Sequence, residues 1–292
     1  MFGEPVWRWT VVASGAQGVA NDDTGNATMS AFKDNLLAGK TAFIAGGTSG
    51  INLGIAKRYA ELGAKVAVAG RNPEKAAGAA AWIGPDALGL SCDVRDYAQI
   101  RGAMEAAVAQ LGKLDIVVSG AAGNFVAPAL GMSANGFRTV VDIDLNGTFN
   151  VFRGCYDLLS LPGASLIAIT AGQAVNPSMM QAHVCAAKAG INQLIRVLAM
   201  EWGPAGVRVN GISPGPIAGT EGMARLSPTE DAAKALAARI PLRRYGEIGE
   251  VAESAVFLVS DSARYITGTI LDCDGGSQLG DARDRDTARG LG

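Results

Sequence analysis

Residues 40–70 constrain the fold more than any other part of this chain. Residues 41–45, TAFIA, form a short apolar run that is typical of a strand buried on both faces. The glycine-rich run GGTSGINLG follows at residues 46–54, and then come an apolar face at helical spacing and a second apolar run at residues 65–69. Such a turn lets the backbone approach a pyrophosphate closely, and the free amides at the helix start attract its negative charge. We therefore predict a strand–turn–helix–strand unit that binds a nucleotide.

The rest of the chain continues this alternation of apolar strands and helices. Further strands are expected at residues 88–92, 115–119, 165–170, 207–212 and 268–274. Helices are expected at residues 73–82, 99–111, 135–159, 179–202 and 250–260, with a mobile helical lid at residues 218–245. This order predicts an α/β fold, a single-domain Rossmann-like doubly wound parallel sheet of about seven strands.

Composition excludes several classes of protein. The chain has 292 residues, 49% of them hydrophobic, and no linker divides it, so we expect one domain at residues 29–280. Residues 1–28 are expected to be a disordered extension, and residues 281–292 a loose charged tail. A net charge of −2 without runs of like charge argues against nucleic acid as a partner.

The apolar runs and the cysteines limit the environment of the protein. No apolar run is long enough to span a bilayer, so no membrane partner is expected. The four cysteines are too dispersed for a disulfide framework or a zinc site, and no metal is expected; they are Cys92, Cys155, Cys185 and Cys273. Dispersed thiols are typical of a reducing compartment, and we predict a cytoplasmic protein.

The residue after the second strand indicates which nucleotide is bound. An acidic residue at this place normally holds a free ribose 2′-hydroxyl, whereas a 2′-phosphate needs a cation and no carboxylate. Here the sequence reads Gly70-Arg71-Asn72. NADP(H) is therefore favoured over NAD(H), with the alternative that Arg71 is an ordinary solvated loop residue.

The spacing of the turn, Gly46-x-x-x-Gly50, resembles the T-G-x-x-x-G-x-G signature of the short-chain dehydrogenase/reductase family. Ala45 stands where that family usually has Thr, and Asn52 replaces its third glycine. The resemblance implies that Asp93, after the third strand, contacts the adenine, although Asp93 could equally cap the helix starting near Tyr97. It implies a cofactor site made of Gly46, Thr48, Ser49, Gly50, Ile51, Asn52, Arg71, Asp93, Val94, Ala121, Ala122, Gly123, Lys188, Pro214, Gly215, Ile217 and Thr220.

Two hydroxyl groups that this family uses for proton transfer are missing. Its carbonyl-reducing members combine a serine with a Tyr-x-x-x-Lys motif, in which the lysine lowers the pKa of the tyrosine. Lys188 fits the lysine, but Val184 stands four residues earlier, and Ala171 occupies the serine position. Either catalysis is lost, or the hydride acceptor is a carbon conjugated to a carbonyl. Reduction there makes a delocalised enolate, which needs hydrogen-bond donors and a proton at carbon but no phenol.

Several segments resemble 2,4-dienoyl-CoA reductases more narrowly, especially the peroxisomal type, which also lacks the tyrosine. They are AAGNF at residues 121–125, DIDLNGTFNV at residues 142–151, His183 followed by Lys188, and residues 201–226. This resemblance implies NADPH-dependent reduction of a dienoyl thioester to a 3-enoyl-CoA. It also implies that Lys188 holds the nicotinamide ribose, that Asp144 is an active-site residue and that Asp274 helps to order a catalytic water.

Other positions fit the resemblance less uniformly. Asn146 matches an active-site Asn of the mitochondrial type, whose active-site tyrosine is replaced by Gln173 here. His183 is the only histidine and either contacts the substrate or is a packed residue. Asp144 either acts directly or anchors Lys188 or a water. Coenzyme A phosphates could meet arginines that are otherwise ordinary surface residues, namely Arg225, Arg243, Arg244 and those of residues 283–289.

Three functions remain open from the sequence. The first is the NADPH-dependent reductase of an enoyl or dienoyl thioester. The second is an enzyme of the same fold that acts on an unrelated hydroxy or keto compound, with water or His183 replacing the phenol. The third is a nucleotide-bound sensor or scaffold without turnover. The resemblance also implies a homotetramer that packs through residues 135–159 and 179–202.

Overall fold

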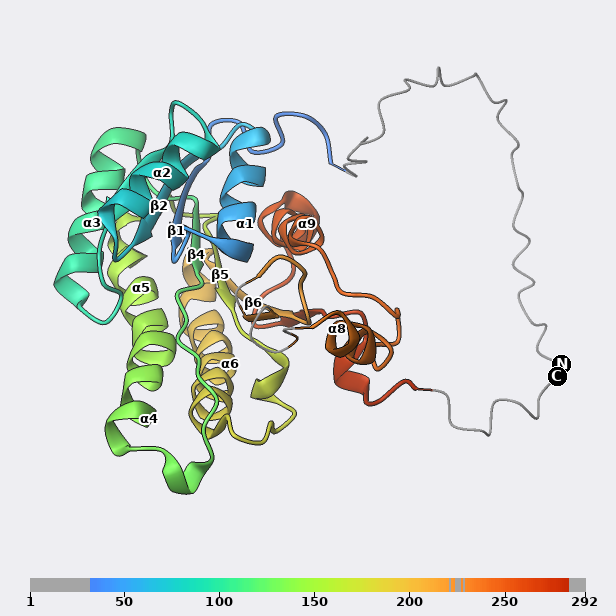
Figure 1. Ribbon diagram of the computed structural model, residues 1–292. Coiled ribbons are helices and arrows are strands. Elements are labelled where there is room, and N and C mark those ends of the chain that lie inside the picture. Colours follow the sequence, from blue (N-terminus) through green and yellow to red (C-terminus); the bar gives the residue numbers. More distant parts are fainter. Residues whose placement is uncertain (1–31, 221, 224–226, 228, 284–292) are drawn as a thin grey trace, which may run out of the picture. The chain divides into compact units, whose positions relative to one another are not determined.

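The computed structural model describes residues 32–283, apart from residues 221, 224–226 and 228 (Figure 1). The expected extension at residues 1–28 lies outside the described residues. So do residues 284–292 of the expected charged tail.

Seven parallel strands form one sheet in the order β3-β2-β1-β4-β5-β6-β7. Figure 1 labels β2, β1, β4, β5 and β6 in this succession. The strands are β1 Thr41–Ala45, β2 Lys65–Gly70, β3 Leu88–Ser91, β4 Ile116–Ser119, β5 Ser165–Ile169, β6 Arg208–Pro214 and β7 Ile270–Cys273. The chain runs outward from β1 to β3, returns to the other side of β1, and continues outward to β7. This reversal places a topological switch point between β1 and β4, where such sheets bind ligands. The predicted doubly wound Rossmann-like fold is confirmed.

Helices cover both faces of the sheet. Helices α1, α2 and α9 contribute to one buried cluster, and α3, α5 and α6 contribute to the other. Strand β1 is apolar apart from Thr41 and wholly buried because Ile44 faces the first cluster and Phe43 faces the second. The helices are α1 Gly50–Glu61, α2 Pro73–Ile83, α3 Tyr97–Leu111, α4 Ala134–Val141, α5 Gly147–Cys155, α6 Ala182–Trp202, α8 Glu230–Ala237 and α9 Ile248–Val259.

The long helix expected at residues 135–159 is divided. A π-helical turn, Asp142–Asn146, separates α4 from α5, and the backbone stays right-handed on both sides of it. A π turn accommodates one extra residue and rotates the side chains that follow. It leaves Asp144 fully buried, whereas Asn146 is exposed to solvent. A regular helical pattern does not contain this offset, so the sequence did not predict it.

Two absences hold for the described residues. None of their helices combines the length and the apolar character that a membrane crossing requires. No group of three or more of their His, Cys, Asp and Glu side chains gathers as metal ligands would.

The packing of α5 leads to a stability prediction. The ring of Phe152 is fully buried in the cluster to which α3, α5 and α6 contribute. Phe152→Ala should lower the free energy of unfolding by about 3–5 kcal/mol because a cavity remains. Urea unfolding measures this value. Phe137 on α4 is 40% exposed, and Phe137→Ala should cost less than about 1 kcal/mol. Equal losses at the two positions would contradict this packing.

Candidate functional site

A cavity of about 550 Å³ opens at the carboxyl ends of the central strands. Its walls come from the first turn of α1, from the segments after β4, β5, β6 and β7, and from α6 and α8. The predicted cofactor residues that line it are Gly50, Ile51, Asn52, Ala122, Gly123, Lys188, Pro214, Gly215 and Thr220. Residues far apart in the sequence therefore meet at the switch point of the sheet.

The glycine-rich turn is shaped for close backbone approach. Gly46 has φ +76°, and a Cβ there would lie 2.6 Å from the backbone nitrogen of Ala121, so no larger residue fits. Gly50 has φ +56° and lines the cavity, and a Cβ there would meet no described atom within 4 Å. The backbone is thus bare where a ligand would approach.

Asn52 explains one departure from the family signature. Its side chain is almost fully buried, and its Nδ2 donates hydrogen bonds to the carbonyl oxygens of Gly120 at 2.8 Å and Gly46 at 3.3 Å. The amide therefore ties the turn to the end of β4. The turn survives without the third glycine because Asn52 is in the first turn of α1 and needs no left-handed backbone.

The start of α1 is suited to a pyrophosphate. In the described structure the N-cap residue, Ser49, makes no side-chain capping hydrogen bond. The first backbone amides of a helix have no partner within the helix, so they remain available to an anion. Together with the bare backbone at Gly50, these amides fit the diphosphate of a dinucleotide.

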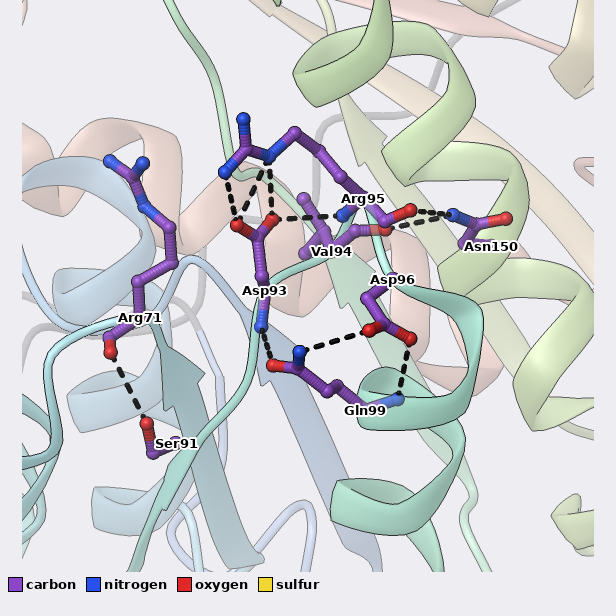
Figure 2. Close-up of polar contacts among 8 residues, drawn as sticks. All are labelled: Arg71, Ser91, Asp93, Val94, Arg95, Asp96, Gln99 and Asn150. Atoms are coloured by element: carbon purple, nitrogen blue, oxygen red, sulfur yellow. Dashed lines mark hydrogen bonds and ion pairs between the residues drawn. The ribbon is translucent and has the colours of Figure 1, made fainter.

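The end expected to hold adenosine is built from Arg71 and Asp93 (Figure 2). Asp96, not Asp93, caps α3, because its Oδ1 accepts from the amides of Ala98 at 2.9 Å and Gln99 at 3.1 Å. The alternative that Asp93 caps this helix is therefore wrong. Asp93 instead pairs with Arg95, whose guanidinium holds the pKa of that carboxyl below its usual value. The sequence analysis did not predict a role for Arg95, although an arginine two residues after Asp93 is close enough to pair with it.

Asp144 and Lys188 form a buried ion pair in the cavity. Lys188 Nζ lies 3.2 Å from Asp144 Oδ2, and the exposed fractions of the two residues are 6% and 0%. Asp144 Oδ1 accepts the Gly123 amide at 2.7 Å, and Lys188 Nζ donates to the Ile169 carbonyl at 3.0 Å. Buried charges need such partners, because their desolvation is otherwise too costly. The π turn and α6 thus bring two predicted site residues together between the ends of β4 and β5.

Two hydroxyl groups form hydrogen bonds that hold the backbone at Asp144. Thr148 Oγ1 donates to the Asp144 carbonyl at 2.6 Å and accepts from Ser119 Oγ at 3.1 Å. Both hydroxyls are buried. The sequence reading did not select Thr148, since a threonine inside a helix carries no distinctive signal.

The positions of the missing serine and tyrosine both face the cavity. Ala171 and Val184 line it, and so does Gln173, whose Nε2 donates to Gln181 Oε1 at 3.1 Å. Within the described part of the chain, no tyrosine lines this cavity. Thr170 lies beside Ala171, but its hydroxyl donates to Asn192 at 2.7 Å inside the protein.

Three of the proposed catalytic residues do not line the cavity. His183 is fully buried, and its ring centroid lies 4.2 Å from that of Phe125. Asn146 donates to Asp142 Oδ1 at 2.8 Å on the exposed side of the helix. Asp274 accepts from the amides of Gly276 and Gln278, both at 2.8 Å, and so shapes the turn that brings Gln278 to the cavity.

The predicted cofactor residues Thr48, Val94 and Ile217 do not line the cavity. Thr48 packs against Gly70, where a Cβ would lie 2.8 Å from the threonine methyl carbon. The carbonyl of Ile217, a buried residue, accepts from the Thr220 hydroxyl at 2.8 Å. Val94 is also buried and packs against Gly147, where a Cβ would lie 2.7 Å from Val94 Cγ2.

The expected lid contains α8, and Thr220, Met223 and Leu236 line the cavity from this segment.

Of the arginines considered for coenzyme A, Arg225 lies outside the described residues. Arg244 pairs with Glu250 at 2.6 Å, and Arg243 donates to the Ala282 carbonyl at 2.6 Å. Arg283, the third described arginine of this set, pairs with Asp281, so all three have contacts within the chain.

Comparison with known proteins shows which family the chain belongs to. A family model described as enoyl-(acyl carrier protein) reductase matches residues 45–278. The chain belongs to the short-chain dehydrogenase/reductase family. It is therefore an NAD(P)-dependent oxidoreductase.

Two curated relatives carry the same name. A Danio rerio protein named peroxisomal 2,4-dienoyl-CoA reductase is 38% identical over 278 residues, covering 94% of this chain and 93% of the relative. An Arabidopsis thaliana protein with the same name is 41% identical and covers 87% of this chain and 89% of the relative. A crystal structure of a Bacillus anthracis short-chain dehydrogenase matches with a TM-score of 0.75 and 36% identity, covering 82% of this chain and 97% of that one.

These names correct one expectation. The prediction of a cytoplasmic protein is wrong, because the relatives from Danio rerio and Arabidopsis thaliana are named as peroxisomal. Dispersed free cysteines distinguish reducing from oxidising surroundings, and they carry no information about which reducing compartment is meant.

The burial of His183 leads to a prediction about pH. Burial lowers the pKa of His183, although the nearby Asp144 charge opposes this effect. Below about pH 6.5 the unfolded chain therefore binds a proton that the folded protein resists, and stability is lost as the pH falls. Thermal unfolding of wild type and His183→Gln from about pH 7 to pH 5 measures the difference. The variant should lose less stability on acidification, and identical pH profiles would contradict this environment.

Proposed function

We propose that this protein uses NADPH to reduce a 2,4-dienoyl-CoA thioester to a 3-enoyl-CoA, without a catalytic tyrosine. The observation that carries the proposal is the buried Asp144–Lys188 pair beside Val184 in the cavity. A site of this kind retains the lysine that holds a nicotinamide ribose, but it offers no phenol to an alcohol oxygen. The names of the relatives support the same substrate class.

Lys188 would hold the nicotinamide half of the cofactor. Its ammonium group has three N–H bonds. Among the described residues, the Ile169 carbonyl accepts one of them, and the Asp144 carboxylate lies 3.2 Å away as the ion-pair partner. An N–H bond therefore remains for a ribose hydroxyl, and the position of Lys188 on α6 sets its direction.

Asp144 would orient the proton source. When bound, the nicotinamide supplies a hydride to the distal carbon of the conjugated thioester. The charge that develops on the thioester oxygen spreads over the conjugated system, so the carbon rather than the oxygen must finally receive a proton. Asp144 faces the cavity with Oδ1 fixed by the Gly123 amide, and its Oδ2 can hold a water between Lys188 and the substrate.

Arg71 supports the choice of NADPH. It follows β2 at the sheet tip where the adenosine ribose binds in this fold, and its side chain is exposed. Among the described residues, no hydrogen bond or ion pair engages its guanidinium. A planar guanidinium is well suited to a phosphate, and it offers a ribose hydroxyl no acceptor.

We also propose that the protein is a homotetramer. Exposed apolar side chains on the outer faces of α5 and α6 support this assembly, namely Phe149, Val197 and Met200.

The catalytic role of the ion pair can be tested with a dienoyl-CoA substrate. Lys188→Met and Asp144→Asn should each lower kcat/KM by at least about a hundredfold, since each removes a charge that positions a reacting group. Loss of NADPH absorbance measures the rate, and circular dichroism checks that both variants fold. No turnover by the wild-type protein with dienoyl-CoA of any chain length would reject this substrate.

The cofactor preference has its own test. Arg71→Gln should raise the KM for NADPH by about tenfold and change the KM for NADH little, because only NADPH has a phosphate at this position. Arg101 on α3, which pairs with Glu105 at 2.7 Å, gives the control variant Arg101→Gln. A similar rise for both cofactors in Arg71→Gln would show that Arg71 does not distinguish them.

A further inference from the structure

The tip of the sheet that faces the adenosine end carries two cations and an anion (Figure 2). Arg71 follows β2, while Asp93 and Arg95 follow β3. These strands are neighbours, with Gly70 opposite Ser91, and Ser91 Oγ donates to the Arg71 carbonyl at 3.2 Å. The three charges therefore act on the same end of a bound dinucleotide.

Arg95 folds back over the carboxylate of Asp93. Its backbone amide donates to Asp93 Oδ1 at 3.0 Å, and its Nε lies 3.0 Å from each carboxylate oxygen. The second guanidinium nitrogen, Nη2, also donates to Oδ2. The negative charge of Asp93 is thus paired within its own turn, where Arg71 also lies near enough to lower the pKa of Asp93.

The turn is held in place without the guanidinium. Asn150 on α5 donates to the carbonyls of Val94 at 2.9 Å and Arg95 at 3.3 Å. The Asp93 amide donates to Gln99 Oε1 at 3.1 Å, and Asp96 caps the same helix. A change confined to the Arg95 side chain therefore leaves the backbone position of Asp93 intact.

An unpaired carboxylate here would oppose a 2′-phosphate. A phosphate monoester carries nearly two negative charges at neutral pH, and a nearby carboxylate would repel it. The same carboxylate would repel a free ribose hydroxyl hardly at all. The charge state of the Asp93 turn therefore acts on NADP(H) far more than on NAD(H).

We infer that Arg95 is a positioning residue that sets cofactor specificity by neutralising Asp93, so that Arg71 alone determines the charge presented to the 2′-phosphate. This inference rests on the proposed preference for NADPH. It adds a second arginine, outside the glycine-rich turn and the tip of β2, to the residues that distinguish the two cofactors.

Two adenosine fragments isolate this effect from catalysis. Adenosine 2′,5′-bisphosphate and 5′-AMP differ only in the 2′-phosphate, so contacts to the adenine cancel in the ratio of their Kd values. Calorimetry on the full chain should show that Arg95→Gln lowers the preference for the bisphosphate by about fivefold, since a neighbouring anion becomes uncompensated. The loss should shrink at high ionic strength.

The chain contains a matched control. Arg283 pairs with Asp281 at the same spacing, with its backbone amide 3.1 Å and its Nε 3.0 Å from Asp281 Oδ1. Arg283→Gln makes the same change in net charge and should leave the ratio unchanged. Arg95→Lys should keep most of the preference, and the double variant Asp93→Asn with Arg95→Gln should return close to wild type because both charges are gone.

The outcomes separate this inference from the proposed cofactor preference. A wild-type preference for the bisphosphate that persists unchanged in Arg95→Gln would overturn the inference alone. Equal wild-type affinities for the two fragments would overturn the NADPH preference, and the inference with it. A fall in Arg95→Gln that the double variant does not reverse would show that Arg95 contacts the phosphate itself, which also rejects a role through Asp93.

Discussion

The buried contact between Asp144 and Lys188 is the constraint on which the site depends. A charge pair with so little exposure needs further polar partners, and here the Gly123 amide binds Asp144 Oδ1 and the Ile169 carbonyl binds Lys188 Nζ. Both partners come from the ends of central strands. The pair therefore fixes α6 and the π turn against the sheet edge at the place where the cavity opens.

The π turn links this electrostatic requirement to the backbone. In a regular helix each side chain is rotated by about 100° from the previous one, and an apolar helix has no natural place for a carboxylate. The extra residue of the π turn Asp142–Asn146 lets Asp144 point inward while α4 and α5 keep their apolar contacts. Such turns are frequent at functional sites because they redirect one side chain without ending the helix.

Charged side chains gather at both ends of the proposed dinucleotide site. At the nicotinamide end the cation of Lys188 is held by a carboxylate that belongs to the cavity. At the adenosine end Asp93 is paired with Arg95, and the Arg71 cation extends from the neighbouring strand end (Figure 2). The cofactor would therefore lie between two charged regions. Each region combines side chains from more than one strand end or helix, so no single element could form it.

The sequence by itself determined the sheet and the glycine-rich turn before α1, and it singled out Lys188 as a candidate site residue. Apolar runs such as residues 41–45 must be buried on both faces, and a bare backbone before a helix predicts a phosphate site without knowledge of distant contacts. Only the tertiary structure decided that His183 is buried behind Phe125, that Asn146 faces solvent and that Asp93 pairs with Arg95 instead of capping α3. The physical reason is that local patterns specify which groups seek burial or solvent, whereas the partner that satisfies a charge depends on how separate elements meet.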